Sequence, residues 1–231
     1  MEYPSVCTGI FLRRPNRFLA EVMVEGESIT VHVRNTGRCE ELLVPGCHVV
    51  LAAADNPERQ TAWDLVAVWK EREQASPLLI NLDAGAPNEA AAEWLPHSGL
   101  FPAGAEIERE VTFGDSRFDF KITAGETISF LEVKGVTLEE NGIAKFPDAP
   151  TERGAKHLRE LAACKAQGYG AYLLFVIQME EASKFEINTE MDPEFNEALH
   201  EADAQGVIIH ARNCAVTPSS MSIRNPVQIL L

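Results

Sequence analysis

The sequence predicts a two-domain protein of mixed β and α/β class, with a small five-stranded barrel over residues 1–82 and a mixed α/β domain over residues 83–231. Five short extended runs fill the first 70 residues, and helical and extended patterns alternate in the remainder. An irregular stretch over residues 76–87, with two prolines and one glycine, separates the two. At 231 residues the chain is long enough for each domain to bury a core.

The five N-terminal runs are separated by turn residues. Their ranges are 5–13, 17–24, 28–34, 47–54 and 61–70. Glu25-Gly26-Glu27 and Pro45-Gly46 are typical of turns. Five short strands favour a small closed barrel, of which the oligonucleotide-binding (OB) fold is the commonest five-stranded kind. An SH3-like barrel has the same pattern.

Helices and strands are predicted in turn for the second domain. Asn88 and Thr151 are the expected N-caps of two helices. The apolar run at residues 171–178 is typical of a strand buried on both faces. In chain order, the predicted elements are a helix over 89–95 that Pro96 ends, a strand over 108–122 kinked at Gly114, a strand over 127–134, a shorter strand or turn through Asn141-Gly142 to Phe146, a helix over 152–167 that Gly168 ends, a strand over 171–178, a helix from Asp192-Pro193 to Gly206, and a strand over 207–211.

Composition indicates a folded protein of a reducing compartment. Hydrophobic residues make up 45% and charged residues 24%, which is ordinary for a globular chain. The five cysteines form no C-x-x-C pair, and their odd number argues against a disulfide framework. The sequence has no secretory signal, and its longest apolar run, residues 169–179, is too short to span a bilayer. We therefore expect a cytoplasmic protein without a membrane partner.

The net charge of −15 is the main argument against nucleic-acid binding, because nonspecific binding depends on Lys and Arg that neutralise phosphates. Both parts are acidic, with 8 basic and 12 acidic residues up to Asp83 and 12 and 23 beyond it. Exposed charges are screened beyond about 8–10 Å at physiological salt, so local clusters decide the outcome. The sequence has no G-x-S-x-G, P-loop or G-x-G-x-x-G motif, which argues against a serine hydrolase, an NTPase and a dinucleotide enzyme.

Asp119, Glu132 and Lys134 are the candidate catalytic residues. Side chains alternate along a strand, so Glu132 and Lys134 share a face. If the strands pair about a turn at Ala124-Gly125, residue 119 faces residue 130, and Asp119 lies diagonal to Glu132 on the same face, with Cβ atoms about 7–8 Å apart. The opposite face then carries an apolar surface made of Phe118, Phe120, Ile122, Leu131 and Val133.

Two carboxylates beside a lysine suit metal-dependent hydrolysis of a phosphodiester. Asp119 and Glu132 would supply oxygen ligands for Mg²⁺ or Mn²⁺, and the ion would polarise the phosphate and lower the pKa of a bound water. Lys134 would orient that water or stabilise the charge that develops on phosphorus. An Asp followed at this distance by Glu-x-Lys is the spacing of the PD-(D/E)xK nucleases. A solvated charge pair on an exposed strand has the same E-x-K pattern.

Basic side chains are the candidate nucleic-acid contacts. Arg153, Lys156 and His157 stand at i, i+3 and i+4 of a predicted helix, so they share a face, and Thr151 with the helix N-terminus lies beside it. A solvated helix face is the competing interpretation. Phe11 and Phe18 are candidate stacking platforms for bases, or core residues. The remaining candidates are five barrel arginines, Arg13, Arg14, Arg17, Arg34 and Arg38, together with Arg117.

Five passages together resemble the sugar fermentation stimulation protein family. They are R-F-L-A-E-V (17–22), N-T-G-R (35–38), S-R-F-D-F (116–120), E-V-K-G-V-T-L (132–138) and F-P-D-A-P-T-E-R-G-A-K-H-L-R-E-L (146–161). The resemblance runs almost from end to end and implies a DNA-binding protein with an OB-type barrel and a restriction-endonuclease-like domain. Glu93 and Glu110 match family glutamates and are candidates for additional metal ligands. The chain departs from the family pattern at Arg34, often proline, at Gly135, often serine, and at Glu89, often arginine.

The sequence leaves two main alternatives for the function. It therefore also leaves open whether the chain is an enzyme. One is a Mg²⁺-dependent nuclease that acts on DNA, or on RNA. The other is a DNA-binding regulator of sugar (maltose) metabolism genes that does not cleave. A third alternative, a structural scaffold for a protein partner, is compatible with the net charge of −15. DNA is expected ahead of RNA, and the oligomeric state is open, a homodimer included.

Overall fold

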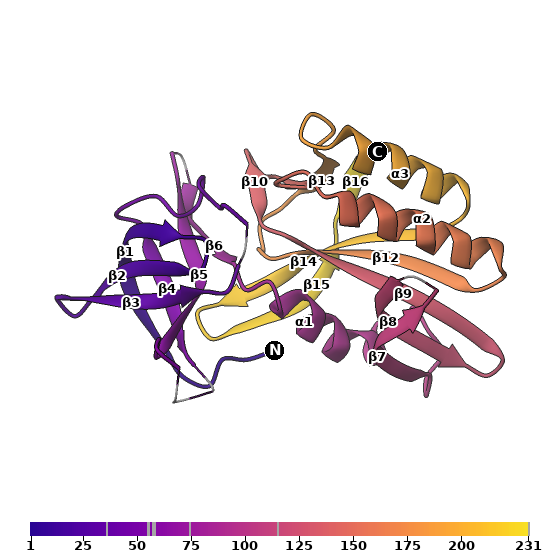
Figure 1. The fold of residues 1–231 in the computed structure, drawn as a ribbon, viewed down its shortest axis with the longest axis horizontal. Coiled ribbons are helices and arrows are strands. Elements are labelled where there is room, and N and C mark those ends of the chain that lie inside the picture. Colours follow the sequence, from indigo (N-terminus) through magenta and orange to yellow (C-terminus); the bar gives the residue numbers. More distant parts are fainter. Residues whose placement is uncertain (36, 55, 57–58, 74, 115, 231) are drawn as a thin grey trace.

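The chain forms a β-rich N-terminal part and a layered α/β part that lie side by side (Figure 1). The structure is a computed structural model, and it describes residues 1–35, 37–54, 56, 59–73, 75–114 and 116–230. The strand order of each sheet confirms the predicted class, a β barrel followed by a mixed α/β domain.

Five strands close the N-terminal barrel in the order β3-β2-β1-β4-β5. A parallel pairing of β3 with β5, at His32–Asp64 and Val33–Leu65, completes the ring. The barrel interior is apolar, and Phe11 lies in it as a core residue. All five predicted strands are confirmed to within three residues, with the bounds β1 Val6–Asn16, β2 Leu19–Val24, β3 Glu27–Val33, β4 His48–Ala53 and β5 Trp63–Arg72.

A sixth strand, β6 (Ala75–Asn81), corrects the prediction of an irregular stretch over residues 76–87. It pairs antiparallel with β5 at the edge of the barrel sheet. Backbone groups make this ladder, so a regular side-chain alternation is not needed, and Pro77 is tolerated on an edge strand. The division of the chain after residue 82 stays a prediction.

The second part is built on a six-stranded sheet in the order β15-β14-β12-β9-β8-β7. Helix α1 (Ala86–Trp94), which continues into the 3-10 turn η1 (Leu95–His97), covers one face, while α2 (Glu152–Ala166) and α3 (Pro193–Ala204) cover the other (Figure 1). The buried strand β12 (Gly170–Ile177) is confirmed and runs parallel to both of its neighbours. The other strands are β7 Glu106–Phe113, β8 Ser116–Ala124, β9 Thr127–Val136, β14 Ile208–Thr217 and β15 Ser220–Pro226.

A smaller sheet of four short strands has the order β10-β11-β13-β16. Asn141 and Gly142 join the first two, and both have positive φ, as a type I′ hairpin requires. The bounds are β10 Leu138–Glu140, β11 Ile143–Phe146, β13 Lys184–Ile187 and β16 Gln228–Leu230. The sequence pattern did not predict β13, β15 or β16. Strands β13 and β16, with four and three residues, are too short to establish a periodicity.

Helix α2 begins at its predicted cap, Thr151, and α3 begins at the predicted Asp192-Pro193, whereas α1 does not begin after its predicted cap. Oγ1 of Thr151 accepts from the Gly154 N–H at 3.0 Å, and Oδ1 of Asp192 accepts from the Phe195 N–H at 2.9 Å. The N-cap of α1 is Gly85 instead of Asn88, which lies inside the helix. Asn88 is therefore free of the capping role, and its side chain reaches β8.

The predicted strand over 108–122 is an antiparallel hairpin rather than one kinked strand. Strands β7 and β8 pair from Glu106–Thr123 to Phe113–Ser116. Gly114, in the left-handed region with φ 59°, lies where the chain reverses.

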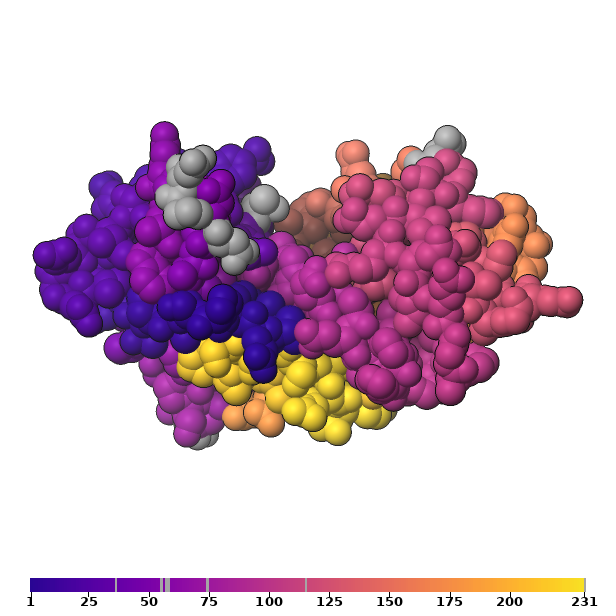
Figure 2. Space-filling model, turned by 90° about the horizontal axis from the view of Figure 1, so that it is seen from below, coloured from indigo at the N-terminus to yellow at the C-terminus, as the bar shows by residue number. Residues whose placement is uncertain are grey.

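The N-terminal segment joins the two parts. Figure 2 shows it, in indigo, running along the yellow C-terminal strands. The Tyr3 N–H donates to the Ser219 carbonyl at 2.7 Å, and Glu2 forms a β-bridge with Ser220. The segment leads into β1 of the barrel, so it ties the barrel directly to β15.

Candidate functional site

Strands β8 and β9 position the three candidate catalytic residues. Their pairing runs from Ala124–Thr127 to Phe120–Leu131, which makes Gly125 and Glu126 the turn. Gly125 has φ 61°, as a type II′ hairpin requires at its first central position. The predicted turn was wrong by one residue and the register by two, a shift that keeps side chains on their expected faces. Continued past Phe120, the observed register sets Asp119 directly opposite Glu132 instead of diagonal to it.

The five apolar residues expected behind the site are all buried, but only four of them lie in the same hydrophobic cluster. Phe120, Ile122, Leu131 and Val133 pack in the cluster that includes α1. Phe118 packs instead in the cluster that includes α2, with its ring centroid 5.4 Å from that of Phe130. Pairing between β8 and β9 ends at Phe120, so the preceding segment is free to twist away from β9.

Glu132 is buried, with only 4% of the residue exposed. Its Oε1 accepts from Nζ of Lys134 at 2.7 Å and also from Nδ1 of His157. Its Oε2 is buried and has no hydrogen-bond partner among the described residues. One oxygen of the carboxylate therefore takes two donors, and the other takes none.

Asp119 is held between α1 and β9. Its Oδ1 accepts from Nδ2 of Asn88 at 2.7 Å, and its Oδ2 accepts from the Val133 N–H at 2.7 Å. A carboxylate oxygen can accept about two hydrogen bonds, so each oxygen keeps some acceptor capacity. Sequence reasoning missed Asn88 as a site residue because a polar residue ahead of a helical run was taken for its cap.

The pKa values of the two carboxylates shift in opposite directions. Burial, together with the negative charge of Glu132, raises the pKa of Asp119, although the bonds from Val133 and Asn88 work against this. Burial also acts to raise the pKa of Glu132, but the bond from His157 and the charge of Lys134 outweigh it and lower that pKa. The lowered pKa favours the anionic form of Glu132, and a cation bound beside Asp119 would favour the anionic form of that carboxyl as well.

The α2 residues expected to bind nucleic acid divide into two groups. His157 is buried and bound to Glu132, so the structure corrects its assignment to the nucleic-acid face. Thr151 caps the start of α2. Its hydroxyl oxygen accepts from the Gly154 N–H, and its own N–H donates to the Asp192 carboxylate at 2.7 Å. Arg153 and Lys156 are exposed, and their contact with nucleic acid stays a prediction.

Arg14 connects two loops of the barrel. Its guanidinium donates to the Gly37 carbonyl at 2.8 Å, to the Asn35 carbonyl at 2.7 Å and to the Arg17 carbonyl at 2.6 Å, and it also donates to the Arg38 carbonyl. A guanidinium that donates to four carbonyls acts as a structural clamp rather than a phosphate ligand. The loops that it joins carry the exposed side chains of Arg17 and Arg38. Both line a pocket of about 440 Å³.

Phe18 lies next to this pocket and is 44% exposed. The Arg17 guanidinium stacks over its ring, 4.6 Å from the centroid. A planar cation on an exposed ring is a surface on which bases stack. We define Arg17, Phe18 and Arg38 as the barrel patch.

Other expected contacts are engaged in ion pairs. Arg13 binds Glu21 through two nitrogens, at 2.8 and 2.5 Å. Arg117 lies 3.5 Å from Glu110. The carboxylate of Glu93 lies 2.5 Å from the N-terminal amine, and within the described part of the chain neither Glu93 nor Glu110 contacts Asp119 or Glu132. We leave both glutamates out of the metal site.

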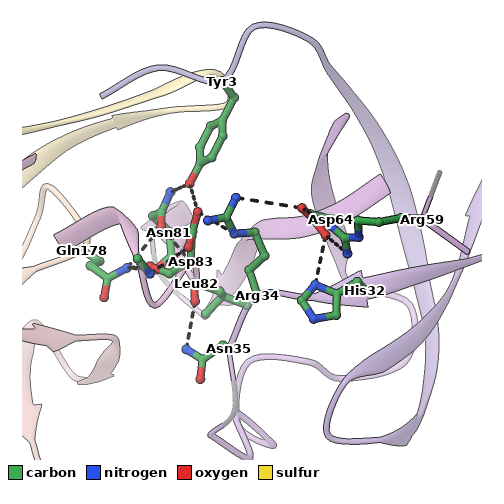
Figure 3. A network of polar contacts seen from close by, with 11 residues as sticks. Tyr3, His32, Arg34, Asn35, Arg59, Asp64, Asn81, Leu82, Asp83 and Gln178 are labelled. Carbon is green, nitrogen blue, oxygen red and sulfur yellow. Dashed lines mark hydrogen bonds and ion pairs between the residues drawn. The ribbon is translucent and has the colours of Figure 1, made fainter. Parts of the chain in front are cut away.

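Arg34 belongs to a polar network where the barrel meets the α/β part (Figure 3). Its Nε lies 3.1 Å from Oδ2 of Asp83, which also accepts from the Tyr3 hydroxyl at 3.1 Å. Asn81 donates to the Tyr3 hydroxyl at 2.9 Å, and Nε2 of Gln178 donates to the Asn81 carbonyl at 3.0 Å. The guanidinium of Arg34 therefore links the barrel to the α/β part, and its contact with nucleic acid stays a prediction.

A groove of about 300 Å³ runs between the barrel and the α/β part. It is lined by Asn35 and Gly37 of the N-T-G-R passage, by Gly135 at the end of β9 and by the segment before α2. Thr36 of that passage lies outside the described residues. Gly37 also lines the pocket at the barrel patch, and Gly135 directly follows Lys134. The groove therefore extends from the barrel patch toward the strand that carries the candidate catalytic residues.

The candidate metal site has two carboxylates. Within the described residues, no group of three or more His, Cys, Asp or Glu is placed to hold a metal ion.

No helix in the described ranges has the length and apolar character needed to cross a membrane.

Comparison with known proteins defines the class of the chain. A family model described as the SfsA N-terminal OB domain matches residues 12–76, and one described as the sugar fermentation stimulation protein RE domain matches residues 85–220. The protein is thus an OB barrel followed by a mixed α/β domain of the kind that the second model describes. It belongs to the sugar fermentation stimulation protein family.

Individual relatives agree over the full length of the chain. A sugar fermentation stimulation protein homolog of Clostridium perfringens strain SM101 is 49% identical, with all of both chains covered. One from Desulfitobacterium hafniense strain Y51 is 48% identical and covers all of this chain and 99% of its own. The solved structure of Pyrococcus furiosus SfsA in complex with Ca²⁺ is 28% identical, covers 100% of this chain and 98% of its own, and has a TM-score of 0.85.

Proposed function

We propose that this chain binds nucleic acid, DNA in preference to RNA, and hydrolyses its phosphodiester bonds with Mg²⁺ or Mn²⁺ held by Asp119 and Glu132. The observation that carries the proposal is Oε2 of Glu132, which is buried, belongs to a carboxylate held as its anion, and has no hydrogen-bond partner among the described residues. A buried anionic oxygen without a donor is costly, and a cation would stabilise it.

The residues fit a hard divalent cation. Carboxylate oxygens are the ligands that Mg²⁺ takes, and the ion is usually bound through one or two carboxylates with water and phosphate oxygens completing its shell. The presence of only two carboxylates is therefore compatible with Mg²⁺. The Pyrococcus furiosus relative was solved with Ca²⁺, another cation that binds oxygen ligands, which supports a cation site of this kind in the family.

Several groups of the chain would have distinct roles in the proposed reaction. A cation bound there would polarise the scissile phosphate and lower the pKa of a coordinated water. Lys134 lies at 2.7 Å from Glu132, so its ammonium is held at the site and would stabilise the charge that develops on the phosphate. Asn88 and the Val133 N–H keep Asp119 in place before any substrate binds.

The barrel patch supports nucleic-acid binding despite the net charge of −15. Arg17 and Arg38 would meet phosphates, and Phe18 with the stacked guanidinium would meet bases. The groove that adjoins the pocket gives a bound strand a route toward β9.

A DNA-binding regulator of sugar metabolism genes that does not cleave is the second candidate. Glu89 favours it, because this residue of α1 forms an ion pair with Arg109 and so neutralises one cation near Asp119. The relatives' description as sugar fermentation stimulation protein homologs also suits a regulatory role.

The test is a cleavage assay on labelled single-stranded DNA, duplex DNA and RNA with Mg²⁺, Mn²⁺ or EDTA. We expect metal-dependent cleavage that Glu132→Gln abolishes, and a loss of about 2–4 kcal/mol of transition-state stabilisation in Lys134→Ala, the amount typical for one preorganised electrostatic donor. Glu126→Gln, in the exposed β8–β9 turn, is the matched control. A wild-type protein that binds DNA but cuts no substrate with either metal would rule out the nuclease and leave a DNA-binding protein that does not cleave.

A further inference from the structure

The buried residue His157 connects an exposed arginine of α2 to Glu132 on β9. Its Nε2 lies 3.3 Å from Nε of Arg153, and its Nδ1 is bonded to Oε1 of Glu132. Residues 153 and 157 are one helical turn apart, so α2 places both side chains on one face, with His157 toward the sheet and Arg153 at the surface. The side chain of His157 is 7% exposed, which excludes the imidazole from direct contact with a large ligand.

The direction of the two hydrogen bonds follows from the arginine. A guanidinium has only donors, so Nε2 of His157 accepts from Arg153. In a neutral imidazole one nitrogen accepts and the other donates, so Nδ1 carries the proton and donates to Glu132. Arg153 thereby selects the tautomer that Glu132 needs.

The consequence concerns the two oxygens of Glu132. His157 and Lys134 both donate to Oε1, which uses about all of its acceptor capacity. Oε2 is buried and receives no donor from the described residues. The carboxylate is therefore held in the one orientation that leaves a whole oxygen for a cation.

We infer that His157 is a positioning residue for the metal site, and that Arg153 acts through it by selecting the tautomer. This inference rests on the proposed function in one respect, that Glu132 is a metal ligand. Residues that orient a metal ligand without touching the metal commonly account for about 10–100-fold in metal affinity.

The first measurement is Mn²⁺ binding, followed by electron paramagnetic resonance of the free ion, so that no cleavage is needed. We expect His157→Ala to weaken binding about 10-fold or more. His157→Asn keeps an N–H close to the Nδ1 position and should stay within about threefold of the wild type. His200→Ala, an exposed histidine of α3, is the control. Thermal unfolding without metal identifies any variant that fails to fold.

The second measurement is the tautomer of His157, read from nitrogen-15 NMR of the metal-free protein. We expect a proton on Nδ1 in the wild type and a mixture of tautomers in Arg153→Ala, whereas Arg159→Ala, an exposed arginine of the same helix, should leave the ring unchanged. A proton on Nε2 in the wild type would overturn the inference regardless of metal.

The outcomes separate this inference from the proposed function. A wild type that binds no Mn²⁺ overturns both the proposed metal site and the metal role of His157. If the wild type binds Mn²⁺ and folded His157→Ala binds it equally well, the positioning role is wrong and the metal site stands.

Discussion

The Asp119 carboxylate accepts a hydrogen bond from the Val133 N–H, 2.7 Å from Oδ2, one residue beyond the end of the β8–β9 ladder. A side chain here replaces the backbone acceptor that a paired strand would offer. Asp119 is therefore held against β9 by the main chain, and its position does not depend on the side chain at 133. The same contact draws a second negative charge toward Glu132, which contributes to the raised pKa of Asp119.

Asp119→Asn is expected to lose Mn²⁺ binding and to lower any cleavage by at least about 100-fold, as for removal of one electrostatic group of a preorganised site. It should not destabilise the metal-free protein at neutral pH. Because the folded-state pKa of Asp119 is raised, the stability it contributes is full below the unfolded pKa, about 3.9, and is lost as pH rises through the folded pKa. Urea unfolding of the two proteins from acid to neutral pH measures this, with Asp203→Asn on α3 as control.

Replacing Arg17 and Arg38 together by Ala should flatten the salt dependence of DNA binding. Each lost phosphate contact lowers the slope of log K against log salt by about 0.7–0.9, so two should lower it by about 1.4–1.8. Arg13→Ala is the matched control, because its guanidinium is already neutralised by Glu21. Equal slopes for the double variant and wild type would move the binding surface away from the barrel patch.

Tyr3→Phe is expected to cost about 1–2 kcal/mol, because it leaves the buried Asp83 and Asn81 short of a partner. Burial and the charge of Asp83 raise the pKa of Tyr3. The wild type should therefore lose stability as pH rises above about 10, where the unfolded chain ionises first, and this loss should be smaller in Tyr3→Phe. Denaturant unfolding at several alkaline pH values tests it. Tyr172→Phe, whose ring packs on Phe101, should retain the alkaline loss.

Gly135→Ser would restore the residue often found in the family and should destabilise this chain by about 1–3 kcal/mol. A Cβ at this position would lie 2.5 Å from Oε1 of Gln178 and 2.8 Å from Cγ of Pro87. Gln178→Ala in the same background should relieve part of the cost, with a coupling energy of at least about 0.5 kcal/mol in a double-mutant cycle. Purely additive effects would mean that Gln178 is not the obstacle.

Features that depend on neighbours along the chain could be predicted from the amino-acid sequence. The five barrel strands, the caps Thr151 and Asp192, and the shared face of Glu132 and Lys134 follow from turn chemistry, capping and the strand pleat, all of which act over a few residues. Even the misplaced β8–β9 turn kept Asp119 on its expected face, because a shift of two residues preserves the alternation.

Tertiary structure alone decided which of these residues meet partners far away in the sequence. Helical spacing groups Arg153 with His157, but only packing of α2 on the sheet turns His157 inward to Glu132 and leaves Arg153 outside. Arg14 and Arg34 look like their basic neighbours in the sequence, yet carbonyls and carboxylates brought by other loops hold them in place. A side chain's local pattern gives its face, whereas its hydrogen-bond partner depends on which distant backbone folds against that face.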